Sequence, residues 1–587
     1  MKKELEVQSP SPSAGFKSTV HLGRSVAVRP PTISGLVRDG YLPKELPPCF
    51  TAEPLSGAAA SLLRDKKLIP TTSGEFQTLK HSNLIRYSMP LRGQKRRKLA
   101  IANPKQFLIM AKLLVSNWKQ IAKFCDAGPY GLSKPIRTDQ ATDRRADWSS
   151  GRHVSPSKSY AEFLDEYLRR GATFPYVAHV DIENYYGSIY THSLCWAVHG
   201  HRNGMKKKPP EWSAALDRCL QVMQQNRTSG IPIGPDSSLV ASEVLLAGID
   251  REIEKRASEE SSFELLRYMD DYYIFAKTKA VAEGLASRIQ AVLNEYHLGI
   301  NEKKSKVYPQ PHAQTSDFAL HVRSHPFARG PGAQRADIDD FFLTLNGHQA
   351  RFEGSTVIDY GLKRMRTVMV HEDNWGRYQS HIVQTFLRHP QVIPLCLEQV
   401  LAYRNTGYEI DMDQLGVGLN ALIERSFSNH EFELTWALWG LRFFDLKLDA
   451  SALGNDLVGL DALSSVLLLD LIKAGRVRGV SQVKAGPWIM AGSLGGPSGA
   501  YWPLLLEACL HSWDGRIKES QLNTDSVFAH LLKNQIHLYD ATRPLPVHPD
   551  FAAGLEAGKP GVFFPESKID TTGLTVLGGG GGGGASP

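Results

Sequence analysis

The hydrophobic pattern of this 587-residue chain changes near residue 330, and this change constrains the fold more than any other feature. From Gly171 to about Pro309, apolar runs of strand length alternate with segments of helical periodicity, as in a mixed α/β domain. After residue 330 strands become hard to find, and amphipathic helices between short polar or glycine-containing breaks are expected at 394–404, 415–427, 430–444 and 455–475. The pattern predicts a mixed α+β domain followed by an all-α half.

The expected domain boundaries follow from this change and from the composition of the two ends. Residues 1–60 are rich in Pro, Ser and Gly, which predicts an irregular N-terminal extension. The mixed domain is expected over 61–325, and a helical domain, read as stacked helical hairpins without a strict repeat period, over 326–550. A tail over 551–587 contains seven consecutive glycines and is left out of the fold prediction.

Composition excludes several classes of protein. The most apolar stretch, 457–472, is interrupted by Asp461 and Asp470 and is too short to span a bilayer, and the N-terminus lacks the apolar core of a secretory signal. These features predict a cytoplasmic protein with no membrane partner. No zinc ligand set is evident, and no CxxC pair or disulfide framework is expected from the six scattered cysteines, Cys49, Cys125, Cys195, Cys219, Cys396 and Cys509.

Positive charge is concentrated in one segment. The whole chain has 68 Lys and Arg against 60 Asp and Glu, a formal net charge of +8, yet residues 81–120 contain nine basic and no acidic residues. The segment predicts a strand at 84–91, a basic turn at 92–98, a strand at 99–104 and a helix at 105–124. A polyanionic partner such as nucleic acid is therefore plausible for this segment.

Two adjacent carboxylates carry the strongest chemical signal. Asp270 and Asp271 separate two β-prone runs, 265–268 and 272–276, which predicts a hairpin with the carboxylates at or beside its turn. Like charges in an apolar frame repel unless a cation neutralises them, and Mg²⁺ is a hard ion that prefers carboxylate oxygens. A solvated turn is the alternative, because paired Asp residues are ordinary in turns.

A third carboxylate, Asp181, ends an apolar run that predicts a strand. A strand that placed Asp181 beside the Asp270 hairpin would complete a site for two metal ions. Such a site suits in-line phosphoryl transfer, in which one ion activates a 3′-hydroxyl and the other stabilises the leaving pyrophosphate.

In order along the chain, VDIENYY, GIPIGPDSSLVASEVLLAGID and RYMDDYYIF resemble palm motifs A, B and C of reverse transcriptases. KRRKLAIANP resembles the fingers motif that holds the incoming triphosphate, and LGINEKKSK resembles the motif that follows the palm, with Ser305 where Thr is more usual. The resemblance covers about residues 80–310. It implies a right-hand polymerase with reverse-transcriptase fingers and palm, acting as an RNA-directed DNA polymerase that uses Mg²⁺ or Mn²⁺.

The resemblance implies roles for individual residues. Asp181, Asp270 and Asp271 match the metal-binding catalytic carboxylates, with Asp271 the least directly coordinated. The residues implied for nucleotide binding are Arg97, aided by Lys95 or Arg92, then Tyr186 as the steric gate against a 2′-hydroxyl, Gly234 beneath the nascent base pair, and Lys304 as a proton donor to pyrophosphate. Three of these roles have a structural alternative: a basic hairpin surface for Arg97, core packing for the ring of Tyr186, and a solvated side chain for Lys304.

One departure from the common pattern narrows the resemblance. Most retroviral, intron and retron enzymes carry Gln before the motif B glycine, whereas Ile233 precedes Gly234 here. The IPIGP form and the helical half resemble the abortive-infection and unknown-group reverse transcriptases of bacteria, whose C-terminal domain is a HEAT-like helical repeat. That group implies antiphage defence by DNA synthesis in the bacterial cytoplasm.

The same group implies the partners. They are dNTPs, an RNA template or noncoding RNA, and a DNA product. Some members attach the DNA product covalently to a hydroxyl group of their own chain. Whether the protein forms a homo-oligomer is left open. The priming residue is unknown, and the tyrosines available in the helical half are Tyr360, Tyr378, Tyr403, Tyr408, Tyr501 and Tyr539. Two other interpretations stay open, a nucleic-acid-binding scaffold with a vestigial palm and a group II intron or retroelement reverse transcriptase.

Overall fold

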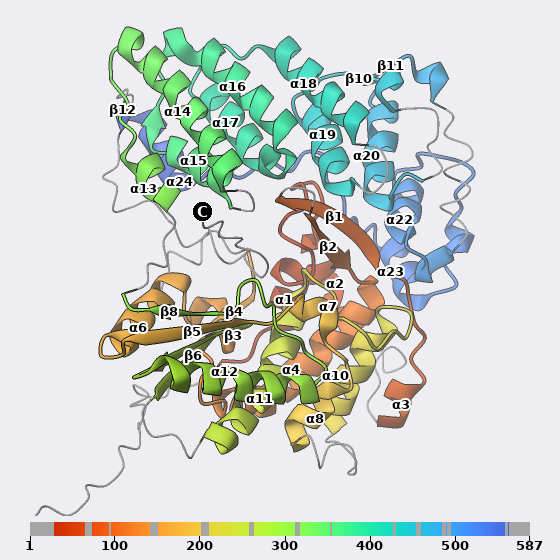
Figure 1. Cartoon of the computed structure of the whole chain (residues 1–587). Coiled ribbons are helices and arrows are strands. Elements are labelled where there is room, and N and C mark those ends of the chain that lie inside the picture. Colours follow the sequence, from red (N-terminus) through yellow and green to blue (C-terminus); the bar gives the residue numbers. More distant parts are fainter. Residues whose placement is uncertain are drawn as a thin grey trace, which may run out of the picture.

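Figure 1 shows the computed structural model, with a mixed α/β half below and a helical half above. The structure describes residues 29–64, 73–92, 95–140, 151–200, 211–257, 263–311, 317–352, 355–426, 430–453, 459–483, 489, 495–557 and 561–562.

The mixed half is built around a four-stranded antiparallel sheet with the strand order β6-β7-β5-β8. The strands are β5 (Tyr176–Asp181), β6 (Phe263–Tyr268), β7 (Asp271–Ala276) and β8 (Lys306–Pro309). The predicted hairpin around Asp270 is thus confirmed.

Helices cover both faces of this sheet. Helix α12 (Lys279–Glu295), with α11 (Asp236–Ala257) beside it, packs on one face, and aromatic residues of α6 (Tyr160–Gly171) pack on the other. Strands covered on both sides need apolar residues at every position rather than at alternate ones. This explains why all of residues 272–276 are buried.

The basic segment 81–120 forms a long β-hairpin and most of a helix. Strands β1 (Ile85–Arg92) and β2 (Lys95–Ile101) pair antiparallel, and α4 (Pro104–Asp126) follows with Asn103 as its N-cap. The predicted order of strand, turn, strand and helix is confirmed, but the basic turn at 92–98 is wrong over Lys95–Lys98, which lie in β2. Backbone pairing with β1 and the hydrogen bonds of Arg96 to Glu433 outweigh the low β-propensity of these basic residues.

The N-terminal segment is more regular than predicted. Helices α1 (Ile33–Asp39) and α2 (Glu53–Leu62) lie within it, so the prediction of an irregular extension to residue 60 is wrong over these elements; residues 1–28 lie outside the described part. Both helices are short, and burial of Leu36 and Leu55 against the domain holds them in place. The other elements of this half are α3 (Ser73–Gln77), β3 (Pro135–Arg137), β4 (Val154–Pro156), α7 (Tyr185–Ser188), α8 (Ser193–His199) and α10 (Glu211–Val222).

The second half is mainly helical. Its helices are α13 (Asp317–Ser324), α14 (Pro331–Arg351), α15 (Val357–Met365), α16 (Trp375–Arg388), α17 (Ile393–Asn405), α18 (Met412–Arg425), α19 (Glu431–Phe443), α20 (Ala462–Lys473), α22 (Trp502–Leu510), α23 (Ser526–Lys533) and α24 (Pro549–Glu556). The four helices expected from the pattern are α17 to α20, and they are confirmed.

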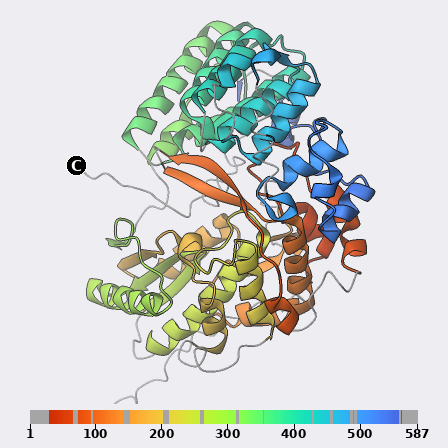
Figure 2. The ribbon, with the colours of Figure 1, turned by 90° about the vertical axis from the view of Figure 1, so that its right-hand side faces the viewer.

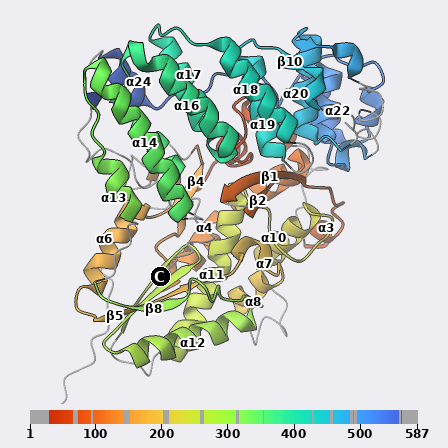
Figure 3. The same ribbon diagram turned by 45° about the horizontal axis from the view of Figure 1, so that its top comes forward.

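Helices of this half lie side by side, as Figure 3 shows for α16, α18, α19 and α20, and α17 packs against α16 and α19. A helical repeat remains a prediction. Two pairs of two-residue strands also occur here, β9 (Val368–Met369) with β12 (Gly561–Val562) and β10 (Leu448–Asp449) with β11 (Val477–Arg478). The predicted tail boundary at 551 is too early, because α24 runs to Glu556 and buries Phe551; the glycine run lies outside the described residues.

The β1–β2 hairpin connects the two halves (Figure 2). Arg96 donates two hydrogen bonds of 2.7 Å to the carboxylate of Glu433 on α19. The hydroxyls of Tyr87 and Thr435 lie 2.8 Å apart, and the backbone N–H of Ser88 donates to Glu431 at 3.1 Å. The helical half therefore braces one side of the hairpin. Within the described ranges, every helix is too short or too polar to cross a bilayer.

Candidate active site

Sheet register brings two of the three predicted carboxylates together. Asp181 at the end of β5 is directly opposite Asp271 at the start of β7. Directly opposed like charges on neighbouring strands destabilise a sheet. Asp181 is 2% exposed, and burial together with the charge of Asp271 raises its pKa above the ordinary value.

Asp270 completes the cluster from the hairpin turn, where the preceding Met269 has a φ of 53°. Asp270 is 9% exposed, and its backbone carbonyl lies 3.4 Å from the N–H of Ile182, the residue after Asp181. Burial, then Asp271, then Asp181 raise the pKa of Asp270 to about 8. The structure thus holds three carboxylates at a place where their negative charges oppose one another.

Polar side chains around the cluster hold two of these carboxylates. Lys304 Nζ lies 2.8 Å from Asp181 Oδ2, and His179 Nε2 lies 2.7 Å from Asp271 Oδ1. His179 stacks on Tyr273, with ring centroids 4.8 Å apart. Lys304, predicted as a proton donor, is in this structure the partner of a carboxylate.

The loop before β8 also holds the backbone of Asp181. The N–H of Asn301 donates to the carbonyl of Asp181 at 2.8 Å, and the N–H of Asp181 donates to the hydroxyl of Ser305 at 3.2 Å. Ser305 therefore supplies the hydroxyl at the position where the resembling motif more usually has Thr.

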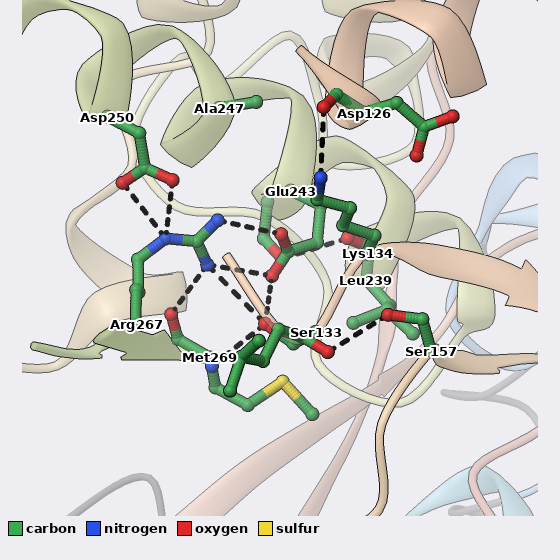
Figure 4. A network of polar contacts seen from close by, with 12 residues as sticks. Asp126, Ser133, Lys134, Ser157, Leu239, Glu243, Ala247, Asp250, Arg267 and Met269 are labelled. Atoms are coloured by element: carbon green, nitrogen blue, oxygen red, sulfur yellow. Dashed lines mark hydrogen bonds and ion pairs between the residues drawn. The ribbon is translucent and has the colours of Figure 1, made fainter. Parts of the chain in front are cut away.

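The buried guanidinium of Arg267 supports the β6–β7 turn (Figure 4). The side chain of Arg267 is 1% exposed and forms ion pairs of 3.0 Å with Glu243 and with Asp250, both on α11. Arg267 also donates to the carbonyl of Met269 at 2.9 Å, and Ser133 accepts from the N–H of Met269 at 2.9 Å. The residue immediately before Asp270 is thus held from both of its backbone polar groups.

A cavity of about 610 Å³ opens beside the carboxylates. Its walls come from the β1–β2 hairpin, from α7, from the loop before α11 and from the β6–β7 turn, and they include Arg97, Tyr186, Gly234, Asp270 and Asp271. The volume and the mixture of basic, acidic and aromatic groups suit a charged ligand of nucleotide size.

The basic residues predicted for nucleotide binding differ in position. Arg97 is half-buried in the cavity wall, where burial lowers its pKa and Glu45 and Asp270 act in the opposite direction. Lys95 is exposed on the same strand and is not part of the wall, and the side chain of Arg92 lies outside the described residues.

The loop that contains Gly234 packs closely against the N-terminal segment of the chain. Gly234 has a φ of 132°, and a Cβ there would lie 2.8 Å from Cγ of Pro43. The N–H of Ala100 on β2 donates to the carbonyl of Ile233 at 2.8 Å, which joins this loop to the hairpin. Packing of the chain against itself therefore already requires glycine at this position.

Sequence reasoning missed two residues of this site. Arg152 lines the cavity and donates to the carbonyl of Gly234 at 3.1 Å and to the buried Asp236 at 2.9 Å. No local pattern marks Arg152, since it meets Asp236 only through the fold. His179 could have been found, because strand alternation places it on the same face of β5 as Asp181.

None of the six candidate priming tyrosines is exposed. Tyr360, Tyr378, Tyr403 and Tyr539 are buried, whereas Tyr408 and Tyr501 are half-buried and donate their hydroxyls to the carbonyls of Val370 and Leu460. The described conformation favours a structural role for all six.

The three carboxylates fit a hard divalent cation. They offer only oxygen ligands, two of them are in contact with Lys304 or His179, and they border a cavity that leaves room for water and phosphate. These residues, on an antiparallel sheet with a basic hairpin across the cavity, define a palm of the nucleic-acid polymerase type.

Comparison with known protein families matches the part of the chain that contains the three carboxylates. The family model described as "Reverse transcriptase (RNA-dependent DNA polymerase)" matches residues 136–318, so the chain contains a reverse transcriptase domain. That range includes Asp181, Gly234, Asp270, Asp271 and Lys304, whereas Arg97 lies before it. The curated proteins contain no match to this sequence.

Solved structures show only distant similarity. The truncated apo telomerase of Candida tropicalis aligns with a TM-score of 0.28 at 12% identity, over 40% of this chain and 52% of that chain. The telomerase of Candida albicans with a TWJ fragment of telomeric RNA aligns at 0.28 and 9%, over 61% and 64%, and a structure described as "RdRp complex" aligns at 0.30 and 10%, over 75% and 48%. This chain spans about half the length of the first and third of these chains. At such TM-scores the assignment rests on the family match and on the geometry of the site.

Proposed function

We propose that this protein is an RNA-directed DNA polymerase that adds dNTPs to a growing strand in the cavity beside Asp270. The observation that carries this proposal is the cluster of Asp181, Asp270 and Asp271, which the end of β5 and the β6–β7 turn bring to one edge of a sheet within the reverse transcriptase domain. Under this proposal the carboxylates would hold two Mg²⁺ ions, which neutralise the charge that develops on the phosphates.

The side chains of the cavity act on the substrate in distinct ways. Arg97 binds the triphosphate, because a guanidinium can donate two parallel hydrogen bonds to phosphate oxygens. Tyr186 occupies the space of a 2′-hydroxyl, and Arg152 holds the Gly234 loop against which the new base pair lies. Lys304 holds Asp181 through an ion pair of 2.8 Å, and it would be available to the pyrophosphate if a cation were bound to that carboxylate.

Templated synthesis by the purified full chain tests the proposal. We expect labelled dNTPs to be incorporated on an RNA template in the presence of Mg²⁺, and incorporation to be lost when Asp270 and Asp271 are both replaced by Ala. Undiminished synthesis by this double variant would contradict the assignment. Synthesis on a DNA template but not on an RNA template would support the assignment as a DNA polymerase and contradict the proposed RNA template.

Tyr186 provides a test of sugar selectivity. Tyr186→Ala is expected to reduce discrimination against ribonucleotides by at least about tenfold, since contacts of this size in a pocket contribute roughly 10–200-fold. The ratio of kcat/KM for dNTP to kcat/KM for rNTP measures the effect. Tyr186→Phe keeps the ring and is expected to keep the selectivity. Equal ratios for Ala and Phe variants would show that the ring only packs.

We further propose that this synthesis serves antiphage defence in bacteria, with the helical half as a HEAT-like repeat domain and with an RNA as template or bound partner. The IPIGP loop and the helical half support this through their resemblance to abortive-infection enzymes. Sequencing nucleic acid that co-purifies with the protein, with and without protease treatment, identifies the template and reveals any covalent protein–DNA bond.

A nucleic-acid-binding scaffold is the second candidate function. The basic hairpin β1–β2 and its bracing by α19 favour it, because a basic hairpin held by the helical half would bind nucleic acid without any need for catalysis. If protection against phage survives the double Ala substitution at Asp270 and Asp271, the scaffold is the better description. Processive copying of any supplied RNA would instead favour a group II intron or retroelement enzyme.

A further inference from the structure

Three metal-ligating side chains meet outside the polymerase cavity. Glu507 lies on α22, His511 is the residue directly after the end of that helix, and His537 lies in the segment after α23. One ligand atom from each lies within 4.8 Å of the other two. None of the three lines the 610 Å³ cavity, so the polymerase site does not account for them.

The carboxylate of Glu507 presents one oxygen to both imidazoles. Its Oε2 lies 3.1 Å from His537 Nδ1 and 3.5 Å from His511 Nε2, while its Oε1 accepts from the N–H of Leu538 at 2.7 Å. The side chain of Glu507 is 1% exposed. A buried carboxylate with one oxygen fixed by the backbone has the other oriented as a ligand.

Contacts between aromatic rings hold the two histidine side chains in place. The ring of His511 stacks on Trp513 with centroids 4.5 Å apart and an interplanar angle of 8°, and its centroid lies 4.6 Å from that of His537. The imidazole side chains are 35% and 30% exposed, which leaves the outer side of the cluster open to water.

Two of these distances are close to those between ligands of a tetrahedral metal site. Zinc–nitrogen and zinc–oxygen bonds of about 2.0–2.2 Å place neighbouring tetrahedral ligands about 3.3–3.5 Å apart. The separation of 3.5 Å between Glu507 and His511 lies at the end of that range, and the separation of 3.1 Å between Glu507 and His537 is slightly shorter, so the three groups would need only small shifts to bind one ion. Two imidazoles and one carboxylate suit Zn²⁺ rather than Mg²⁺, which prefers oxygen ligands only.

We propose that Glu507, His511 and His537 bind one Zn²⁺ ion, with water in the open position. The ion would join α22 to the segment 536–540. That segment also pairs with the mixed half, since Tyr539 forms a β-bridge with Phe50 and the N–H of Asp540 donates to the carbonyl of Cys49 at 2.7 Å. Zinc at this position therefore stabilises the contact between the two halves of the protein.

Zinc binding by the full chain tests the proposal. Protein depleted of metal is supplied with Zn²⁺ in excess Mg²⁺, which under the proposed function would occupy the polymerase carboxylates. Bound zinc is then counted by elemental analysis after gel filtration. We expect one Zn²⁺ per wild-type chain, loss of that ion in His511→Asn and in His537→Asn, and its retention in His530→Asn, a matched histidine on α23 outside the cluster. Zinc should also raise the Tm of the wild type and of His530→Asn only.

A measurement on the wild type alone keeps the test independent of variant folding. Co²⁺ in the same site is expected to show the intense visible absorption of four-coordinate cobalt, and Zn²⁺ should displace it. Absence of this absorption, or zinc uptake that is the same in all variants, would overturn the proposal. The cluster would then be only a contact between the carboxylate of Glu507 and the two histidines. Templated synthesis by His511→Asn reports separately on the polymerase.

Discussion

Asparagine in place of Asp270 is expected to abolish nucleotide incorporation and, in the same protein, to stabilise the metal-free fold. The proposed metal ions contribute several kcal/mol of charge stabilisation to phosphoryl transfer, and each 1.4 kcal/mol is a factor of ten in rate. Loss of one carboxylate ligand should therefore lower the rate by about 10³-fold or more. Labelled dNTP incorporation under single-turnover conditions measures this loss.

The gain in stability has a defined pH dependence. The pKa of Asp270 is raised from 3.8 to about 8 by burial and by its two carboxylate neighbours. Its contribution to stability is fully present below pH 4, where the carboxyl is neutral in both states, and is lost as the pH rises toward 8. Metal-free wild type should thus lose Tm over this window relative to Asp270→Asn, which carries no charge there.

Added Mg²⁺ separates this effect from a general change in packing. Because a cation binds the folded state, it should raise the Tm of the wild type at pH 8, and it should raise that of Asp270→Asn less. Equal Tm values for the two proteins without metal at pH 8 would show that the carboxylates do not repel. Retained synthesis by the Asn variant would remove Asp270 from the catalytic machinery.

The hairpin at Asp270 could be predicted from sequence because its determinants are local. Two β-prone runs flank two consecutive polar residues, and antiparallel pairing of neighbouring runs needs no distant information. The same holds for helices α17 to α20, whose apolar periodicity is strong. The family resemblance then placed Asp181 beside this hairpin, which no local pattern could have done.

Features that depend on distant contacts were missed for a common reason. Arg152 contacts Asp236 from 84 positions away, and His511 lies 26 positions before His537. The sequence showed no zinc ligand set, and the spacing of the proposed ligands Glu507, His511 and His537 fits no short motif. Helices α1 and α2 were missed because their stability comes from burial against the domain rather than from their own composition.

Arg267 belongs to the motif that contains Asp270 and Asp271, but its role in the structure could not be predicted from that motif. It stands beside the recognisable carboxylates in an apolar strand, where a charged side chain is either at the surface or paired in the interior. In the structure its guanidinium is paired with Glu243 and Asp250, and all three side chains are at most 1% exposed. The hydroxyl of Tyr272 donates to Asp250 at 2.9 Å as a further partner.

Methionine in place of Arg267 is expected to destabilise the protein by about 3–5 kcal/mol, because removing one partner of a buried ion pair leaves uncompensated charge. Two carboxylates would be stranded on α11. Arg256→Met is the matched control, since Arg256 pairs with Glu295 at 2.7 Å with both side chains 35% exposed, and such a pair contributes about 1 kcal/mol at most. Thermal and urea unfolding of the two variants measure the difference.

Removing the stranded charges distinguishes charge from shape. The triple variant Arg267→Met, Glu243→Gln, Asp250→Asn has no buried charge in this network, so it should recover part of the stability that Arg267→Met loses. It should not recover synthesis, because the carbonyl of Met269 still lacks its donor and the turn that presents Asp270 is held on one side only. A triple variant as active as the wild type would show that the turn holds Asp270 in place without Arg267. Arg267→Met that unfolds like Arg256→Met would show that the ion pairs contribute little net free energy.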